Sequence, residues 1–195
     1  HLLVNKILLI GCGHMGGALL KAWSYNLKYS FIVVDPNQYK KINKSYSKNI
    51  KVLKSFTEIK NFKSIEIIIF AVKPQQIELV LSDMTKYNFN KQAIFVSIVA
   101  GKKINFFNKF LPKYNKFVRV MPNMPAVINQ GITCLVSNKN FTIKNKKQID
   151  SLFLLVGETI WINKESDINK VTAISGSGPG YVFLFIDAFE KAAAK

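Results

Sequence analysis

Short apolar runs alternate with longer amphipathic stretches along most of this chain. The runs with the length and hydrophobicity of buried strands are 6–10, 31–34, 65–71, 93–97, 117–120, 132–136 and 159–162. Helical patterns occupy 15–25, 75–86, 105–111 and 144–156, each after a Gly, Pro or polar residue. Strands that alternate with helices form a parallel sheet with helices on both faces. The pattern therefore predicts a doubly wound α/β domain.

The pattern changes at about residue 164. Residues 165–174 have helical spacing, the sequence SGSGPG interrupts that helix, and 181–195 read as an apolar helix. Such a helix is not stable alone in water and must pack on another element or subunit. We expect one domain over 1–163 and the beginning of an all-helical domain over 164–195. Because the sequence lacks an initiating Met and stops within a predicted helix, we also expect it to be a fragment.

The formal net charge of +17 would ordinarily suggest a nucleic-acid or membrane partner. Arg119 is the only arginine among the basic residues, however, and nucleic-acid readers rely on Arg for bidentate contacts. Lysine here accompanies many Asn and Ile, as in AT-rich coding sequence. We therefore expect no nucleic-acid partner, although a polyanion-binding module stays an alternative that would make binding to DNA salt-dependent.

The sequence also bears on the location of the protein in the cell. The uncharged and mostly apolar stretch 171–186 falls short of the about 20 residues that span a bilayer, so we expect no membrane segment. The start of the chain leaves no room for a signal peptide. Cys12 and Cys134 are too few and too far apart for a disulfide framework or a metal site. These features predict a cytoplasmic protein without a metal.

A glycine motif, Gly11-Cys12-Gly13-His14-Met15-Gly16, follows the first predicted strand and opens the first predicted helix. This is the context of the dinucleotide-binding fingerprint of Rossmann folds. Gly11 would make the tight turn, Gly13 would let a pyrophosphate approach the backbone, and Gly16 would let helix and strand pack closely. The helix N-terminus would supply N–H donors to the phosphates.

An acidic residue, Asp35, ends the second predicted strand at about the 20-residue spacing expected after the glycines. A carboxylate there accepts hydrogen bonds from the adenosine ribose and repels a 2′-phosphate, which favours NADH. Lys40 and Lys41 follow closely and could balance a phosphate. Asp35 can also serve only as a turn residue before Pro36. The choice between NADH and NADPH stays open.

Three further segments follow predicted strands at the edge of the sheet where ligands bind. The first is Ala71-Val72-Lys73-Pro74, in which Lys73 faces either a ligand or solvent, and the second is the small-residue turn SIVAG at 97–101. The third, RVMPNMPA at 119–126, contains Asn123 between two prolines and the single arginine. Arg119 either anchors this loop or contacts substrate.

In this order, GCGHMGGA, AVKPQ, SIVAG, RVMPNMPA, LLVGE and ESDINKVTAISGSGPGY resemble the pyrroline-5-carboxylate reductase family over nearly the whole chain. The resemblance implies reduction of the cyclic imine 1-pyrroline-5-carboxylate to L-proline by NADPH or NADH. It also implies a helical dimerisation domain and a homo-oligomer. The family usually has Asn where His14 stands and Ala where Gly180 stands, and neither change removes a needed backbone group.

The resemblance also assigns site residues. Gly11, Gly13, His14, Met15 and Gly16 would contact the pyrophosphate, and 35–37 (Asp35, Pro36 and Asn37) would lie near the adenosine ribose. The nicotinamide side would be flanked by Ala71, Val72, Lys73, Pro74, Val99 and Ala100. Asn123, with Pro125, would shape the cleft, and Glu165 with Thr172 would lie near the substrate.

The implied chemistry needs no catalytic triad, because the cofactor supplies the hydride and the protein aligns donor and acceptor. We therefore assign no catalytic residue. The family's later carboxylate-binding loop would follow Lys195, so we expect this chain alone to lack activity. The alternative within enzymes is another NAD(P)-dependent reductase such as a hydroxyacid dehydrogenase, for which Lys170 would be the only candidate catalytic lysine.

Overall fold

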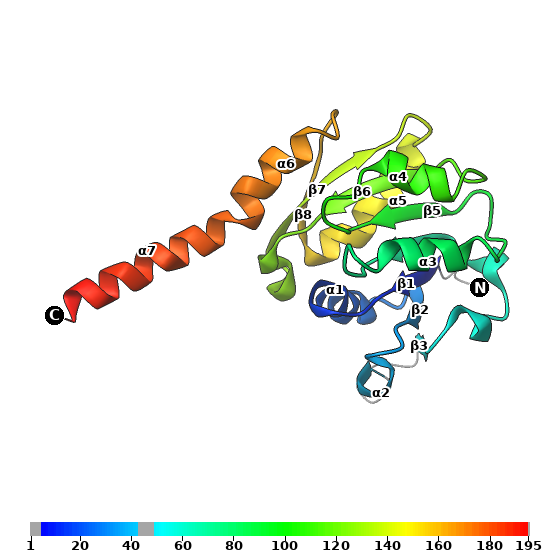
Figure 1. The fold of residues 1–195 in the computed structure, drawn as a ribbon, viewed down its shortest axis with the longest axis horizontal. Helices are drawn as coiled ribbons and strands as arrows, with labels where there is room; N and C mark the ends of the chain where they lie inside the picture. Colours follow the sequence, from blue (N-terminus) through cyan, green and yellow to red (C-terminus); the bar gives the residue numbers. More distant parts are fainter. Residues whose placement is uncertain (1–4, 43–48, 195) are drawn as a thin grey trace.

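The computed structural model describes residues 5–42 and 49–194, and its body is built on one eight-stranded sheet (Figure 1). The strand order is β3-β2-β1-β4-β5-β6-β7-β8. The strands are β1 (Asn5–Ile10), β2 (Tyr29–Val34), β3 (Ile50–Leu53), β4 (Ile67–Phe70), β5 (Ile94–Ser97), β6 (Phe117–Met121), β7 (Gly131–Ser137) and β8 (Gly157–Trp161). The first six strands have the Rossmann order, so the predicted fold class is confirmed.

The sheet is not parallel throughout, which corrects the sequence prediction. Strands β1 to β6 are parallel, whereas β7 pairs antiparallel with β6 and β8 pairs parallel with β7. The loop between β6 and β7 contains only the short 3-10 helix η3 (Met124–Ile128). A parallel connection needs a crossover of a dozen or more residues, so this short loop reverses the chain direction.

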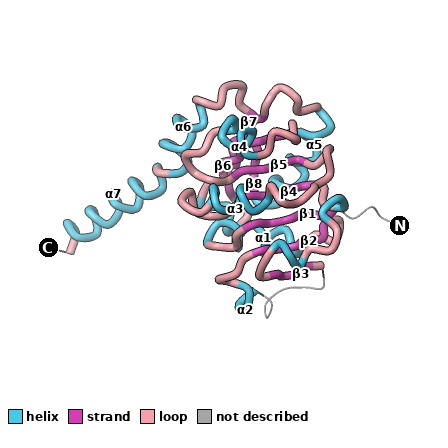
Figure 2. Tube along the Cα trace, turned by 45° about the vertical axis from the view of Figure 1, so that its right-hand side comes forward, coloured by secondary structure: helices cyan, strands magenta, loops and turns pink. Residues whose placement is uncertain are grey.

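Helices cover both faces of the sheet (Figure 2). One core packs α1 (His14–Ser24) and α5 (Ile143–Phe153) against one face, and the other packs α3 (Ile77–Met84) and α4 (Ile104–Phe110) against the opposite face. Alternate residues of β1 divide between them, with Ile7 and Leu9 in the first core and Leu8 and Ile10 in the second. Both faces are buried, which explains the continuous apolar strands.

Two elements were absent from the sequence prediction. They are α2 (Tyr39–Ile42) and the edge strand β3, which lie on either side of residues outside the described part of the chain. Short 3-10 helices η1 (Phe56–Glu58), η2 (Phe62–Ser64) and η4 (Leu154–Val156) complete the body. With only four residues, one of them the exposed Lys51, β3 lacks the longer apolar run that marks the inner strands.

The C-terminal segment is helical with less interruption than the SGSGPG sequence predicts. Helix α6 (Asp167–Val171) continues through a π-helical turn (Thr172–Gly176) into α7 (Gly178–Ala193). The N–H of Ser177 donates to the carbonyl of Thr172, which lets the turn absorb an extra residue. Pro179 lies in the first turn of α7, where a missing N–H costs no helical bond. The last residue of the predicted helix, Lys195, lies outside the described residues.

Helix α7 projects away from the body as an arm (Figure 1), and none of its residues is buried. By contrast, α6 lies against β7, where Ile168 is fully buried beside Cys134 and Val136. Within the described part of the chain, no helix combines the length and the hydrophobicity that crossing a membrane requires.

Candidate functional site

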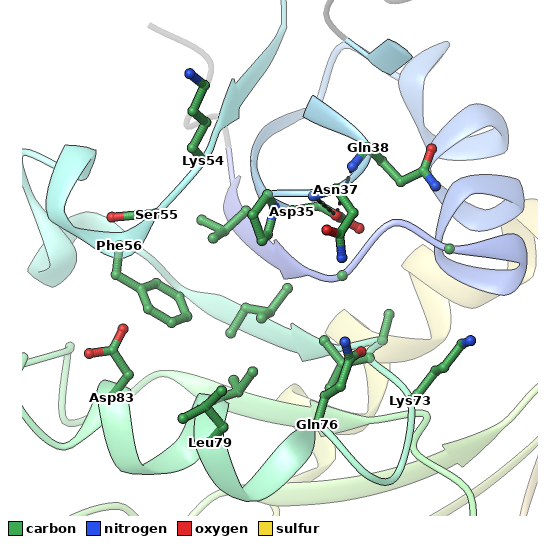
Figure 3. A pocket seen from close by; sticks show the side chains of 18 residues that line it. Asp35, Asn37, Gln38, Lys54, Ser55, Phe56, Lys73, Gln76, Leu79 and Asp83 are labelled. Atoms are coloured by element: carbon green, nitrogen blue, oxygen red, sulfur yellow. Dashed lines mark hydrogen bonds between the residues drawn. The ribbon is translucent and has the colours of Figure 1, made fainter. Parts of the chain in front are cut away.

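The candidate site is a pocket of about 460 Å³ at the ends of β1, β2, β3 and β4 (Figure 3). From β1 the chain crosses to β2 on one side, whereas β4 leads to β5 on the other. Ligands of open α/β sheets bind outside the carboxyl ends of the strands at such a reversal. The topology therefore places this pocket where a dinucleotide binds in this class of fold.

The glycine loop between β1 and α1 has the geometry that a phosphate cradle requires. Gly11 has a φ of +86°, and a Cβ there would lie 2.8 Å from the carbonyl oxygen of Ala71. A Cβ on Gly16 would lie 2.8 Å from the carbonyl oxygen of Gly11. A Cβ on Gly13, by contrast, would meet no atom within 4 Å. Gly11 and Gly16 thus close the loop on itself, while Gly13 leaves open space on the pocket side.

The start of α1 adds donors to this space. The helix begins at His14, its N-cap residue Gly13 offers no side-chain cap, and no acidic residue occupies its first turn. The first N–H groups of such a helix carry partial positive charge and seek an acceptor. A diphosphate fits this position, since it would supply acceptors to the amides and meet no Cβ at Gly13.

Asp35 lines the pocket, but its carboxylate is largely committed to the backbone. Oδ2 accepts a hydrogen bond from the Cys12 N–H at 2.7 Å, and Oδ1 accepts from the N–H groups of Asn37 and Gln38, both at 2.9 Å. A carboxylate has about four acceptor positions, so three backbone bonds leave about one for a ribose hydroxyl. Asp35 therefore joins the glycine loop to the turn after β2, in addition to facing the ligand space.

Cys12 lies buried within the same loop. Burial, and then the negative charge of Asp35, raise the pKa of its thiol to about 11. The thiol therefore stays protonated at neutral pH and is a poor nucleophile. Cys12 contributes its backbone N–H to the site rather than reactive sulfur.

The wall of the pocket opposite the glycine loop was not predicted from the sequence. Lys54, Ser55 and Phe56 follow β3, and a stripe on one side of α3 faces them, formed by Gln76, Leu79, Val80 and Asp83. The spacing of this stripe is that of one helix face, and Leu79 is its exposed apolar member. The helical spacing of an apolar residue, Leu79, among polar ones was the signal that the sequence offered for this wall. The residues 54–56 could be placed in the wall only once β3 was known to be a strand.

The predicted cofactor residues divide into two groups. Those that line the pocket are Gly11, Gly13, Asp35, Pro36, Asn37, Ala71, Val72 and Lys73. His14, Met15, Gly16 and Pro74 are their neighbours in the chain, outside its lining. Val99 and Ala100 follow β5 at the same edge of the sheet, with Val99 buried and Ala100 exposed. The roles of both groups stay predictions.

The three predicted substrate residues lie apart from this pocket, and each side chain already bonds within the protein. The Asn123 carboxamide oxygen accepts from the Ile132 N–H at 2.9 Å, which fixes the loop between β6 and β7. The Thr172 hydroxyl donates to the Ile168 carbonyl. Glu165 accepts from the N–H of Ile104, the first residue of α4, at 2.8 Å.

Arg119 meets Glu165 where the body joins the C-terminal helices. Its Nη1 lies 3.6 Å from the Glu165 carboxylate, and its buried Nε has no partner within the described residues. The arginine side chain is 4% exposed, whereas that of Glu165 is 24% exposed. The pair links β6, the start of α4 and the segment leading into α6, which supports an anchoring role for Arg119.

Comparison with known proteins gives the two parts of the chain separate matches. Residues 6–101 match the family described as NADP oxidoreductase coenzyme F420-dependent, and residues 165–195 match pyrroline-5-carboxylate reductase dimerisation. The pyrroline-5-carboxylate reductase of Haemophilus influenzae is 34% identical over 97% of this chain and 69% of the relative. That of Escherichia coli is 35% identical over 97% of this chain and 70% of the relative.

The chain belongs to the pyrroline-5-carboxylate reductase family. The chain spans about two thirds of the length of these two reductases. Among solved structures, the Plasmodium falciparum pyrroline carboxylate reductase with NADP bound aligns with a TM-score of 0.79 at 30% identity, covering 97% of this chain and 69% of that one. The Coxiella burnetii reductase gives 0.83 at 26% identity, covering 98% and 71%.

Membership of this family decides between the two enzyme classes considered from the sequence. A 3-hydroxyacyl-CoA dehydrogenase of Archaeoglobus fulgidus aligns with a TM-score of 0.63 over 94% of this chain and 64% of that one, but at 14% identity it shares only the fold. The chain is therefore an oxidoreductase with an NADP-type cofactor site, and the hydroxyacid dehydrogenase alternative is not favoured.

Proposed function

We propose that the complete protein containing this chain reduces 1-pyrroline-5-carboxylate to L-proline with a reduced nicotinamide cofactor. The observation that carries the proposal is the pocket at the β1/β4 reversal. It combines a glycine loop, an open position at Gly13 and the uncapped start of α1 in a chain of the reductase family. The cofactor, when bound, supplies a hydride to the C=N carbon of the imine.

The chain's own task is to bind and orient the cofactor. Gly11, Gly13 and Gly16 would admit the diphosphate to the amides of His14 and Met15. Asp35, Pro36 and Asn37 would border the adenosine ribose. The nicotinamide side would be bordered by Ala71, Val72, Lys73 and Pro74 after β4, and by Val99 and Ala100 after β5. This set follows successive strand ends from β2 to β5, which suits an extended dinucleotide.

The substrate side is assigned to the junction of the body with the helical segment. Asn123 holds the loop after β6, and Glu165 holds the N-terminus of α4. We assign positioning to these two residues and a substrate-facing location to Thr172. The proposed domain boundary between 163 and 164 is supported by the dimerisation match, which starts at 165.

A homo-oligomer is the assembly that suits α7. Its exposed apolar residues are Tyr181, Val182, Phe183, Leu184, Phe185, Ile186 and Phe189. Large contiguous apolar surfaces mark interaction sites. The dimerisation family matched by this segment supports a second copy as the partner. The cytoplasmic location also stays a proposal, supported by the two free cysteines.

The decisive experiment measures oxidation of NADPH and of NADH by the complete protein, with 1-pyrroline-5-carboxylate as substrate and proline identified as product. We expect turnover that depends on the imine, and none with 3-hydroxyacyl-CoA and the oxidised cofactors. Cofactor binding without imine-dependent turnover would overturn the substrate assignment while leaving the dinucleotide site intact.

A further inference from the structure

The carboxylate after β2 is turned inward in this chain. Asp35 is buried and directs its two oxygens to backbone N–H groups on both sides of the pocket rim. A carboxylate that discriminates against a 2′-phosphate needs free acceptor positions and an exposed charge. Asp35 offers little of either. Selection between the two nicotinamide cofactors therefore depends on the groups around it.

The fold brings the backbone of Lys54 beside that of Asp35. Val34 pairs with Leu53, and the Asp35 N–H donates to the Leu53 carbonyl at 3.2 Å, so the two strands end level with each other. Lys54 directly follows the last residue of β3 and lines the same pocket. Figure 3 shows it on the β3 side of the pocket, across from the turn at Asn37.

The backbone at Lys54 is fixed, whereas its ammonium is available. The N–H groups of Lys54 and Ser55 both donate to Oε1 of Glu58, at 2.8 and 3.1 Å. The Lys54 ammonium lies 5.3 Å from the centroid of the Tyr39 ring and forms no ion pair among the described residues. Lys54 is exposed, and a cation–π contact at an exposed site is weak, so the ammonium can leave the ring to meet an anion.

The other charged residues of the pocket do not compete for this position. Asp83 lies beyond Phe56 in Figure 3 and pairs with Lys86 at 2.9 Å. Lys73 follows β4, on the side of the pocket where α1 begins. Among the described residues that line the pocket, Lys54 is thus the cation near the proposed adenosine ribose position that has no ion-pair partner.

We propose that Lys54 binds the 2′-phosphate of NADPH and makes this chain select NADPH over NADH, with Asp35 serving the loop structure instead. The inference rests on the proposed function, because it assumes the dinucleotide orientation described there. It reverses the preference for NADH that Asp35 alone suggests.

The test separates 2′-phosphate recognition from catalysis by using adenosine 2′,5′-bisphosphate and 5′-AMP as probes in calorimetric titrations of the complete protein. We expect the wild-type protein to bind the bisphosphate about tenfold or more tightly than 5′-AMP, as one charge-assisted contact provides. Lys54→Gln should remove most of that ratio and leave the affinity for 5′-AMP unchanged. Lys54→Arg should retain it.

The matched control is Lys51→Gln, which removes an exposed lysine of β3, three residues before Lys54 and outside the lining of this pocket. Equal binding of both probes by the wild-type protein would overturn the role of Lys54 and leave the proposed reductase function standing. Loss of both probes in Lys54→Gln, or an equal effect of Lys51→Gln, would also overturn it. Binding of neither probe would overturn the dinucleotide site itself.

Discussion

The body and the arm of this molecule use similar apolar residues in opposite ways. In the body, Trp23 and Phe153 are fully buried, and both faces of the sheet are covered. In α7, Phe183 is 71% exposed and no residue is buried. Hydrophobicity along a sequence therefore predicts that a surface will be covered, but it does not say whether the cover comes from the same chain.

The transition between these regions lies within the C-terminal helices rather than at their beginning. Helix α6 is attached to the body through Ile168 and through the Glu165 contacts with Arg119 and Ile104. Ile168 is the last buried residue among the described residues, and neither the π-helical turn nor α7 contains one. The arm is thus carried on a fixed base, which orients its apolar surface relative to the cofactor pocket.

The largest predicted effect is on the body core. Phe153→Ala removes a fully buried ring that packs edge-on against Trp23, with 5.5 Å between ring centroids. The resulting cavity should lower the free energy of unfolding by about 4 kcal/mol, measured by urea denaturation. Leu154→Ala, the next residue, is 56% exposed and should change it by less than about 1 kcal/mol. Similar losses for both would contradict the description of this core.

Two glycines within the body should separate folding from binding. Gly11→Ala places a Cβ against the Ala71 backbone at a positive φ and should cost about 3 kcal/mol of stability. Gly13→Ala meets no protein atom, so the melting temperature should stay within a few degrees while NADPH affinity falls about tenfold or more. Denaturation and NADPH titration of both variants measure this. Unchanged NADPH binding by Gly13→Ala would remove the basis for the phosphate cradle.

Most of the fold follows from the sequence because its signals are local. The seven predicted strands and the four predicted helices of the body all appear, with small shifts at their ends. The glycine loop could also be predicted from the sequence, since a strand, a GxGxxG motif and a helix occur in direct succession. Such features need no knowledge of distant contacts, and their physical causes lie within a few residues.

The features that the sequence did not predict depend on contacts between distant parts of the chain. The edge strand β3 is stabilised by pairing with β2, so its four residues carry too little apolar signal to be recognised alone. The reversal at β7 follows from the short connection after β6, which contains only η3, and the apolar pattern of the strands does not encode it. The sequence likewise indicates an acidic residue at Asp35, but only the structure shows that Cys12, Asn37 and Gln38 occupy its oxygens.

A smaller effect is expected at the junction of body and arm. Glu165→Gln keeps an acceptor for the Ile104 N–H but removes the charge opposite Arg119. Because Glu165 is partly exposed, we expect a loss of only about 1 kcal/mol. A double-mutant cycle with Arg119→Met, read by urea denaturation, should give a coupling free energy of similar size. Strictly additive losses would mean that the 3.6 Å contact does not stabilise the junction.

The smallest effect on folding, and the clearest contrast with Phe153, is expected in the arm. Phe185 is 64% exposed, and its ring lies 4.7 Å from that of Phe189, centroid to centroid. Phe185→Glu should therefore change the unfolding free energy of the body by less than about 0.5 kcal/mol. In the complete protein, the same change places a charge in the apolar surface proposed to meet a second copy, which should shift the assembly toward monomer.

Sedimentation velocity would measure that shift, with denaturation of the body followed in parallel by the fluorescence of Trp23 and Trp161, both of which lie in the body. Glu190→Gln is the control, since it alters an exposed polar residue of the same helix without adding charge to the apolar surface. Unchanged association in Phe185→Glu would show that α7 does not form the interface. A large loss of body stability would instead show that α7 folds back on its own chain, because only buried contacts within the chain can transmit such a cost to the core.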